Sequence, residues 1–185
     1  MTANERLLKR EVIELKREGI ALRRENRALR ERLASAKPFT GAAVEFYIAK
    51  LIGGQLTKGL TQYDVKGADG TKFEIKFSRL NIPHSRAVSH RWSWSRPLGS
   101  SGAKQFHRLI LVGQVDPQYR HAYCEPRSSY VIFDVPFRSV KRLMRKDPII
   151  QISTNPSAKQ SDPGKELFRR FHVSRQQLRE RYKDA

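Results

Sequence analysis

The chain has 185 residues, with 37 lysines and arginines against 18 aspartates and glutamates, and its formal net charge is +19. This length allows one domain with a buried core and an accessory segment, and the single cysteine, Cys124, excludes an intramolecular disulfide or a zinc cage built from cysteines. The first ten residues lack the apolar stretch of a signal peptide and the apolar runs are too short to span a bilayer, so we expect a cytoplasmic protein without membrane contact.

Residues 4–36 contain no proline and are dominated by leucine, arginine, glutamate and lysine, which predicts one long helix. Leucines recur at heptad spacing and define position d: Leu8, Leu15, Leu22 and Leu29. Position a then holds Val12, Gly19, Asn26 and Leu33. Leucine at d with valine at a favours two parallel strands, and a single asparagine at a fixes their register.

Charged side chains beside this seam support the same arrangement. Position g holds Glu11, Glu18 and Glu25, and position e holds Lys16, Arg23 and Arg30. In a parallel pair each g residue meets a basic e residue of the partner helix, so these pairs attract. We therefore expect residues 1–36 to be a leucine-zipper-like coiled coil that forms a homodimer through residues 4–36. The alternative is one helix packed on its own domain, which Ile13 and Ile20, outside the seam, support.

Residues 37–185 are predicted to form one domain of mixed α and β structure. A helix is expected over 39–53, because Thr40 can cap its first turn and Gly53 can end it. Gly67-Ala68-Asp69-Gly70 is a hairpin signal between strands expected over 61–66 and 71–77. The elements expected next are a long loop over 81–104, strands over 106–113 and 129–135, a helix over 139–145, a strand over 149–153, a loop over 155–164, and a helical tail over 165–182 that breaks near His172, before a capping box of Ser174 with Gln177.

The candidate chemistry lies on the predicted hairpin. Alternation along the second strand places Lys72, Glu74 and Lys76 on one face. Asp64 lies on the paired strand, and Glu45 on the preceding helix. Carboxylates beside a lysine form a hard oxygen site that suits Mg²⁺, which can polarise a phosphate and activate water.

The order Glu45, Asp64, Glu74-Ile75-Lys76, with a helix leading into the hairpin, resembles the PD-(D/E)xK nuclease superfamily of restriction-endonuclease-like proteins. Tyr63-Asp64 stands at the place of the Pro-Asp pair, and the tyrosine departs from that pattern without removing a ligand. The resemblance covers residues 39–135. It implies an α/β (α+β) fold of the restriction-endonuclease-like kind, in which helices flank a mixed central sheet.

The same resemblance implies the roles of the site residues. Asp64 and Glu74 would bind Mg²⁺ together with the backbone carbonyl of Ile75, and Mn²⁺ would substitute for Mg²⁺. Lys76 would act on the attacking water. Glu45 would hold a metal-bound water or a second metal.

Further candidates lie outside these motifs. Two tryptophans between arginines can stack on bases, although on a strand they would belong to the core. The residues expected to contact DNA are Arg79, Arg91, Trp92, Trp94, Arg96 and Lys104. Lys104 and Gln105 could instead reach the active site. The tail arginines contact phosphates or lie on a solvated helix: Arg169, Arg170, Arg175, Arg179 and Arg181.

The charge of residues 37–185 indicates the partner. This domain carries 27 basic and 12 acidic side chains, an excess that is typical of nucleic-acid-binding proteins. We therefore expect a homodimeric, Mg²⁺-dependent DNA endonuclease of the type II restriction kind, in which each subunit cuts one strand. The alternatives are a DNA repair or junction-resolving nuclease of the same fold and a catalytically inactive DNA-binding module.

Overall fold

The computed structural model describes Glu14, Glu18, Gly19 and residues 40–57, 62–82, 89–123, 125, 127–145, 147–157 and 162–183. The chain divides by its internal packing into two units, Met1–Pro38 and Phe39–Ala185. In the first unit, Glu14, Glu18 and Gly19 are helical. The rest of the predicted coiled coil, including the leucine seam, lies outside the described residues.

The second unit begins with helix α2, Gly41–Ile52, at the place expected from the sequence. The Thr40 hydroxyl accepts a hydrogen bond from the Ala43 N–H at 3.3 Å and caps the first turn. Gly53 ends the helix in the left-handed region, with a φ of 67°. The buried face of α2 consists of Val44, Ile48, Ala49 and Ile52.

In the described part of the chain, six strands form a mixed sheet in the order β1-β2-β3-β5-β6-β8. Their bounds are β1 Gln55–Leu56, β2 Val65–Lys66, β3 Lys72–Ser78, β5 Arg108–Gln114, β6 Tyr130–Pro136 and β8 His172–Val173. β3 and β5 run parallel, and the other neighbouring pairs run antiparallel. The expected hairpin is confirmed, although its first strand is shorter than predicted because the chain bends before Val65.

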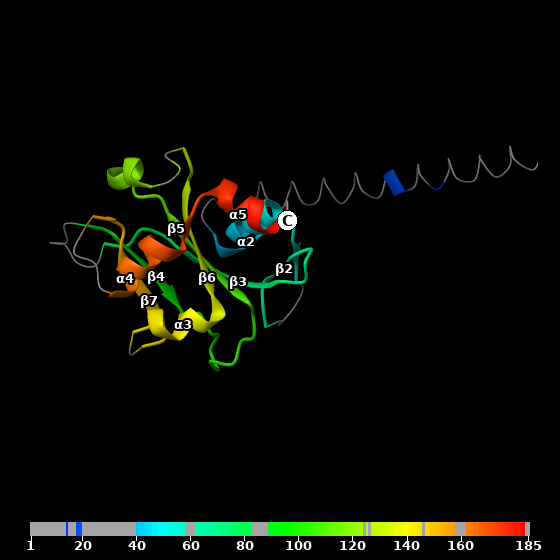
Figure 1. Ribbon diagram of the computed structural model, residues 1–185, viewed down its shortest axis with the longest axis horizontal. Helices are drawn as coiled ribbons and strands as arrows, with labels where there is room; N and C mark the ends of the chain where they lie inside the picture. Colours follow the sequence, from blue (N-terminus) through cyan, green and yellow to red (C-terminus); the bar gives the residue numbers. More distant parts are fainter. Residues whose placement is uncertain are drawn as a thin grey trace, which may run out of the picture. The chain divides into compact units, whose positions relative to one another are not determined.

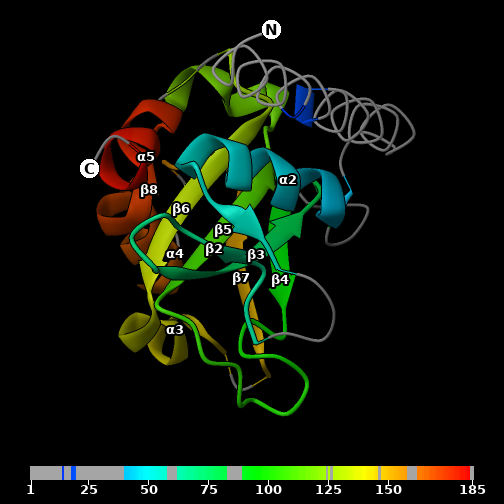
Figure 2. The same ribbon diagram turned by 90° about the vertical axis from the view of Figure 1, so that its right-hand side faces the viewer.

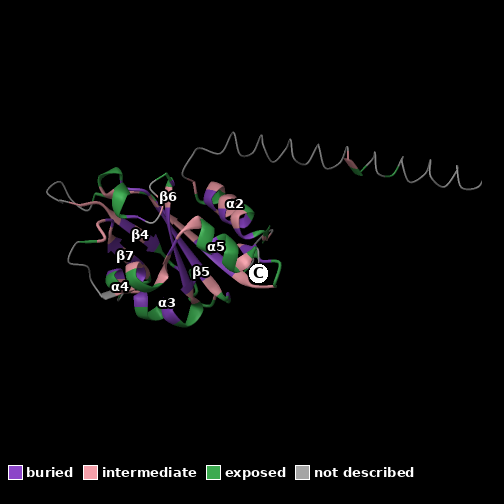
Figure 3. Ribbon diagram, turned by 45° about the horizontal axis from the view of Figure 1, so that its top comes forward, coloured by how far each residue is buried: buried purple, intermediate pink, exposed green. Residues whose placement is uncertain are grey.

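Both faces of this sheet are covered (Figure 1, Figure 2). On one face α2 packs beside α5, Arg175–Tyr182, over Ile75 and Ile110 of the strands. The layer on the other face consists of β4 Arg91–Ser95, α3 Phe137–Leu143, β7 Ile149–Ser153, α4 Asp162–Glu166 and the π-helical turn η2 Leu167–Phe171. The 3₁₀ helix η1 Pro117–Ala122 follows β5. Strands β5 and β6 between these layers are buried along most of their length (Figure 3). The predicted mixed sheet flanked by helices is confirmed.

Part of the segment expected as a long loop forms strand β4, which pairs antiparallel with β7. Trp92 and Trp94 of β4 are 0% and 1% exposed. Their indole N–H groups donate to the backbone carbonyls of Gln114 (2.9 Å) and Val112 (3.0 Å). A Cβ atom at Gly113 would lie 2.5 Å from the Trp92 ring, so this glycine makes the packing possible. The expectation that the two tryptophans contact DNA is therefore wrong, because buried rings cannot stack on bases.

The C-terminal segment breaks at the place expected from the sequence. After α4 and η2 the chain extends, and β8 pairs antiparallel with β6. Ser174 then accepts a hydrogen bond from the Gln177 N–H at 3.0 Å, and the Gln177 side chain accepts one from the Ser174 N–H at 2.8 Å. This capping box starts α5 and confirms the prediction.

Candidate active site

Glu74 is the central residue of the site. It lies on β3 and is 0% exposed, although it carries a carboxylate. The Lys104 ammonium donates to both carboxylate oxygens at 2.7 Å. The Lys76 ammonium lies 2.7 Å from Oε1 of the same carboxylate. Two positive charges therefore compensate one buried negative charge, which would otherwise be costly to remove from water.

Asp64 is held beside Glu74 by the backbone of the hairpin. Its N–H donates to the Phe73 carbonyl at 2.8 Å, and its own carbonyl accepts from the Thr57 N–H at 2.9 Å. Its Oδ2 accepts a hydrogen bond from the Ile75 N–H at 2.7 Å. Its Oδ1 lies 3.9 Å from the Lys104 ammonium, which is thus placed between the two carboxylates.

The loop before β5 presents Lys104 to these carboxylates. The Lys104 N–H donates to the carbonyl of buried Leu98 at 3.1 Å. Gly99 and Gly102 have φ values of 78° and 71°, which glycine adopts without strain. A Cβ atom at Gly99 would lie 2.9 Å from Cγ of Lys104, so the lysine stem passes directly over this glycine. The loop is therefore folded around the stem of Lys104.

Glu45 belongs to the same electrostatic cluster. It lies on α2 and is half-buried. Burial raises the pKa of Glu45, and the charge of Asp64 raises it further, whereas Lys76 opposes the change. Burial also raises the pKa of Glu74, against the hydrogen bonds from Lys104 and Lys76. The charges of the neighbouring site residues therefore act on the pKa values of Glu45 and Glu74.

The residues of this site fit a magnesium ion. The position between Asp64 and Glu74 already suits a cation, because the Lys104 ammonium lies there. Among the described residues, no cluster of three or more carboxylate, histidine or cysteine side chains is arranged to hold a metal. Mg²⁺ typically binds through one or two carboxylates and keeps waters or substrate phosphates as its other ligands. A pair of carboxylates is therefore sufficient for this ion.

The other residues expected to contact DNA do not form one cluster. Arg79 is exposed directly after β3, and Arg96 is exposed after β4 with a φ of 48°. Arg91 begins β4, where its backbone pairs with Asn81. Lys104 lies against the carboxylates, while its neighbour Gln105 is exposed.

The comparison with known proteins adds no relative. No family model matches this chain, and no curated protein matches its sequence. Within the described residues, no helix combines the length and apolar character needed to cross a membrane. The fold and the site together define an α+β protein with a mixed central sheet, whose strand β3 carries a buried carboxylate bound by two lysines.

Proposed function

We propose that the protein is a cytoplasmic, Mg²⁺-dependent DNA endonuclease whose metal ligands are Asp64 and Glu74. The observation that carries this proposal is that both carboxylates face the same cation. The Lys104 ammonium nitrogen lies 2.7 Å from Glu74 and 3.9 Å from Asp64. Clustered carboxylates with an adjacent lysine suit phosphodiester hydrolysis. The resemblance of Glu74-Ile75-Lys76 to the PD-(D/E)xK motif points to the same chemistry.

Each residue has a role in this proposal. Mg²⁺ at this position supplies a Lewis acid for the scissile phosphate and lowers the pKa of a bound water. Asp64 and Glu74 would hold the ion, the Ile75 carbonyl would be a further ligand, and Mn²⁺ would be able to replace Mg²⁺. Lys76 orients the attacking water and neutralises developing charge. Glu45 would hold a metal-bound water or a second metal ion.

The proposed enzyme cuts duplex DNA as a homodimer. A parallel coiled coil through residues 4–36 would bring two subunits together, and each would supply one active site for one strand. The excess of 27 basic over 12 acidic side chains in residues 37–185 supports a polyanionic substrate.

The test is cleavage of plasmid, branched DNA and RNA by purified protein with Mg²⁺ or with EDTA. Asp64→Asn and Glu74→Gln should abolish cleavage, since each removes a ligand charge with little change in shape. Lys76→Met should lower the rate by about 10²-fold or more, because it removes the ammonium that acts on the attacking water. Glu45→Gln should have a milder effect.

Asp69→Asn is the matched control for these substitutions. Asp69 lies in the turn of the same hairpin, where it accepts hydrogen bonds from the Thr71 N–H (2.8 Å) and hydroxyl (2.6 Å). This variant should cleave at the wild-type rate. Undiminished Mg²⁺-dependent cleavage by Glu74→Gln would refute the proposed site. Preferential cleavage of branched DNA would identify a junction-resolving nuclease of the same chemistry.

A second candidate function is a catalytically inactive DNA-binding domain. It is favoured by the two lysines that already bind the Glu74 carboxylate, since such a network can be purely structural. This candidate predicts salt-dependent DNA binding with neither metal binding nor cleavage. Calorimetric titration of the wild-type protein with Mn²⁺ distinguishes the two candidates without relying on activity.

A further inference from the structure

Helix α3 and the segment α4–η2 form a strongly charged surface. In α3 the exposed charged side chains are all basic, and α4–η2 adds further exposed basic side chains. We call this surface the basic face, and it consists of Arg138, Lys141, Arg142, Lys165, Arg169 and Arg170. Such a concentration of one sign over two adjacent elements attracts a polyanion.

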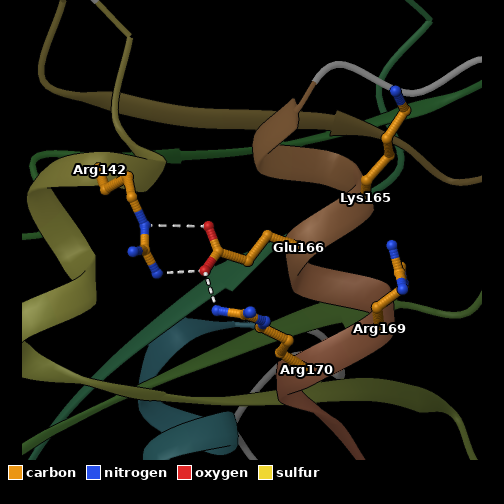
Figure 4. Close-up of a pocket in the computed structure, with 5 residues that line it drawn as sticks. All are labelled: Arg142, Lys165, Glu166, Arg169 and Arg170. Carbon is orange, nitrogen blue, oxygen red and sulfur yellow. Dashed lines mark hydrogen bonds and ion pairs between the residues drawn. The ribbon is translucent and has the colours of Figure 1, made fainter.

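The basic face contains a hollow (Figure 4) of about 450 Å³. In Figure 4, Arg142 extends from α3 toward Glu166, and Arg170 approaches the same carboxylate from the helix that carries Lys165 and Arg169. The Nε of Arg142 donates to Glu166 at 3.1 Å, and Nη1 of Arg170 lies 3.5 Å from it. A second hollow of about 410 Å³ shares Arg142 and Arg170 and adds Arg138. Glu166 thus orients two guanidinium groups while the surface keeps its excess positive charge.

Two arginines of α5 do not belong to the basic face, because they pair with carboxylates elsewhere in the domain. Arg181 pairs with the buried carboxylate of Asp134, and Arg175 pairs with Glu125 at 2.6 Å. These two arginines therefore fasten α5 to the domain. Arg169 and Arg170 instead line the hollow and are exposed.

The basic face lies on the same side of the sheet as Glu74. In the parallel register of β3 and β5, Glu74 is opposite Leu109, so their side chains share one face. Leu109 is buried in one cluster with Val140 and Leu143 of α3. The Phe137 N–H also donates to the His107 carbonyl at 3.0 Å, which ties the start of α3 to the segment that follows Lys104. Glu74 and α3 therefore lie on the same face of the sheet.

We propose that the basic face binds the phosphate backbone of the DNA whose scissile phosphate lies at Glu74, an inference that rests on the proposed function. Arginine forks bind phosphate oxygens in two-point geometry and do so without reading the base sequence. The basic face therefore sets affinity and the direction of the duplex, while cleavage depends on the carboxylates.

The experiment compares two double variants that remove the same charge. Arg138→Gln/Arg169→Gln changes the basic face, whereas Lys50→Gln/Arg179→Gln changes the opposite layer, formed by α2 and α5. Affinity for a fluorescent duplex is measured in EDTA over a series of salt concentrations, and thermal unfolding verifies that both variants are folded. For the basic-face variant, the slope of log affinity against log salt should decrease by about 0.9 for each phosphate that the protein no longer neutralises. The control should keep the wild-type slope.

Equal slopes for the two double variants would overturn the proposal. It would also be overturned if the basic-face variant kept its DNA affinity but no longer bound phosphatidylserine vesicles, because the surface would then serve a membrane. Since binding is measured without metal, this result is independent of catalysis. Weaker DNA binding by the basic-face variant, with no cleavage by the wild type, would support the basic face and refute the nuclease. Normal cleavage with unchanged slopes would refute the basic face alone.

Discussion

The Lys104 ammonium donates to both oxygens of the Glu74 carboxylate at 2.7 Å, from a loop 30 residues further along the chain. Glu74 has no exposed surface, so this contact provides much of its compensating charge. The same ammonium lies within 3.9 Å of Asp64. If a divalent cation binds Asp64 and Glu74, as we propose, it has to compete with the Lys104 ammonium for these carboxylates.

Lys104→Met should bind Mn²⁺ more tightly than the wild type in calorimetric titrations without DNA. A charge-assisted hydrogen bond contributes about 1.5–3 kcal/mol. Mn²⁺ no longer has to break this bond in the variant, so its affinity should rise by roughly tenfold or more. Lys104→Arg keeps the positive charge and should bind Mn²⁺ about as weakly as the wild type. Equal Mn²⁺ affinity in Lys104→Met and the wild type would show that the ammonium does not compete with the metal.

Trp92→Ala should lower the free energy of unfolding by about 3–5 kcal/mol in urea titrations, because it empties the centre of the core and removes the hydrogen bond to the Gln114 carbonyl. Ser95→Ala, at the exposed end of the same strand, should change it by less than about 0.5 kcal/mol. Full stability of Trp92→Ala, together with weaker DNA binding, would instead place the indole at the DNA surface.

His172 should make folding sensitive to mild acid. Its ring lies against Phe133 and Phe168, and this burial lowers the pKa of His172. As the pH falls below about 6.5, the unfolded chain takes up a proton that the folded protein binds more weakly, so the free energy of unfolding decreases.

The check is urea unfolding at about pH 7.5 and about pH 5.5. His172→Phe should lose less stability between these two conditions than the wild type. His121→Gln, at an exposed position in η1, should keep the wild-type difference. If His172→Phe and the wild type have the same pH dependence, the histidine is not the group responsible.

Deletion of residues 1–36 should leave a folded domain that sediments as a monomer and nicks plasmid instead of cutting both strands. The expected reason is the loss of the predicted coiled coil, and the unit Phe39–Ala185 retains its own core. Asn26→Val should strengthen association but allow more than one oligomeric state, because a buried asparagine at position a penalises other registers. A full-length protein that sediments as a monomer at micromolar concentration would contradict the dimer.

Interactions between neighbouring residues explain the elements that were predicted correctly. Thr40 and Gly53 delimit α2, and Ser174 with Gln177 starts α5, because caps act over three or four residues. The alternation along β3 likewise placed Glu74 and Lys76 on one face, since the strand period is local.

Contacts between segments far apart in the sequence could not be predicted in this way. Residues 91–95, expected in a loop, form a strand because Trp92 pairs with Ile152, which lies 60 residues away in the sequence. Lys104 reached Glu74 because the loop before β5 folds back over β3, and Arg181 became a structural residue because Asp134 lies buried beneath it. Such contacts follow from how the packed layers close around the core, whereas caps and side-chain alternation depend on the residues nearest in sequence.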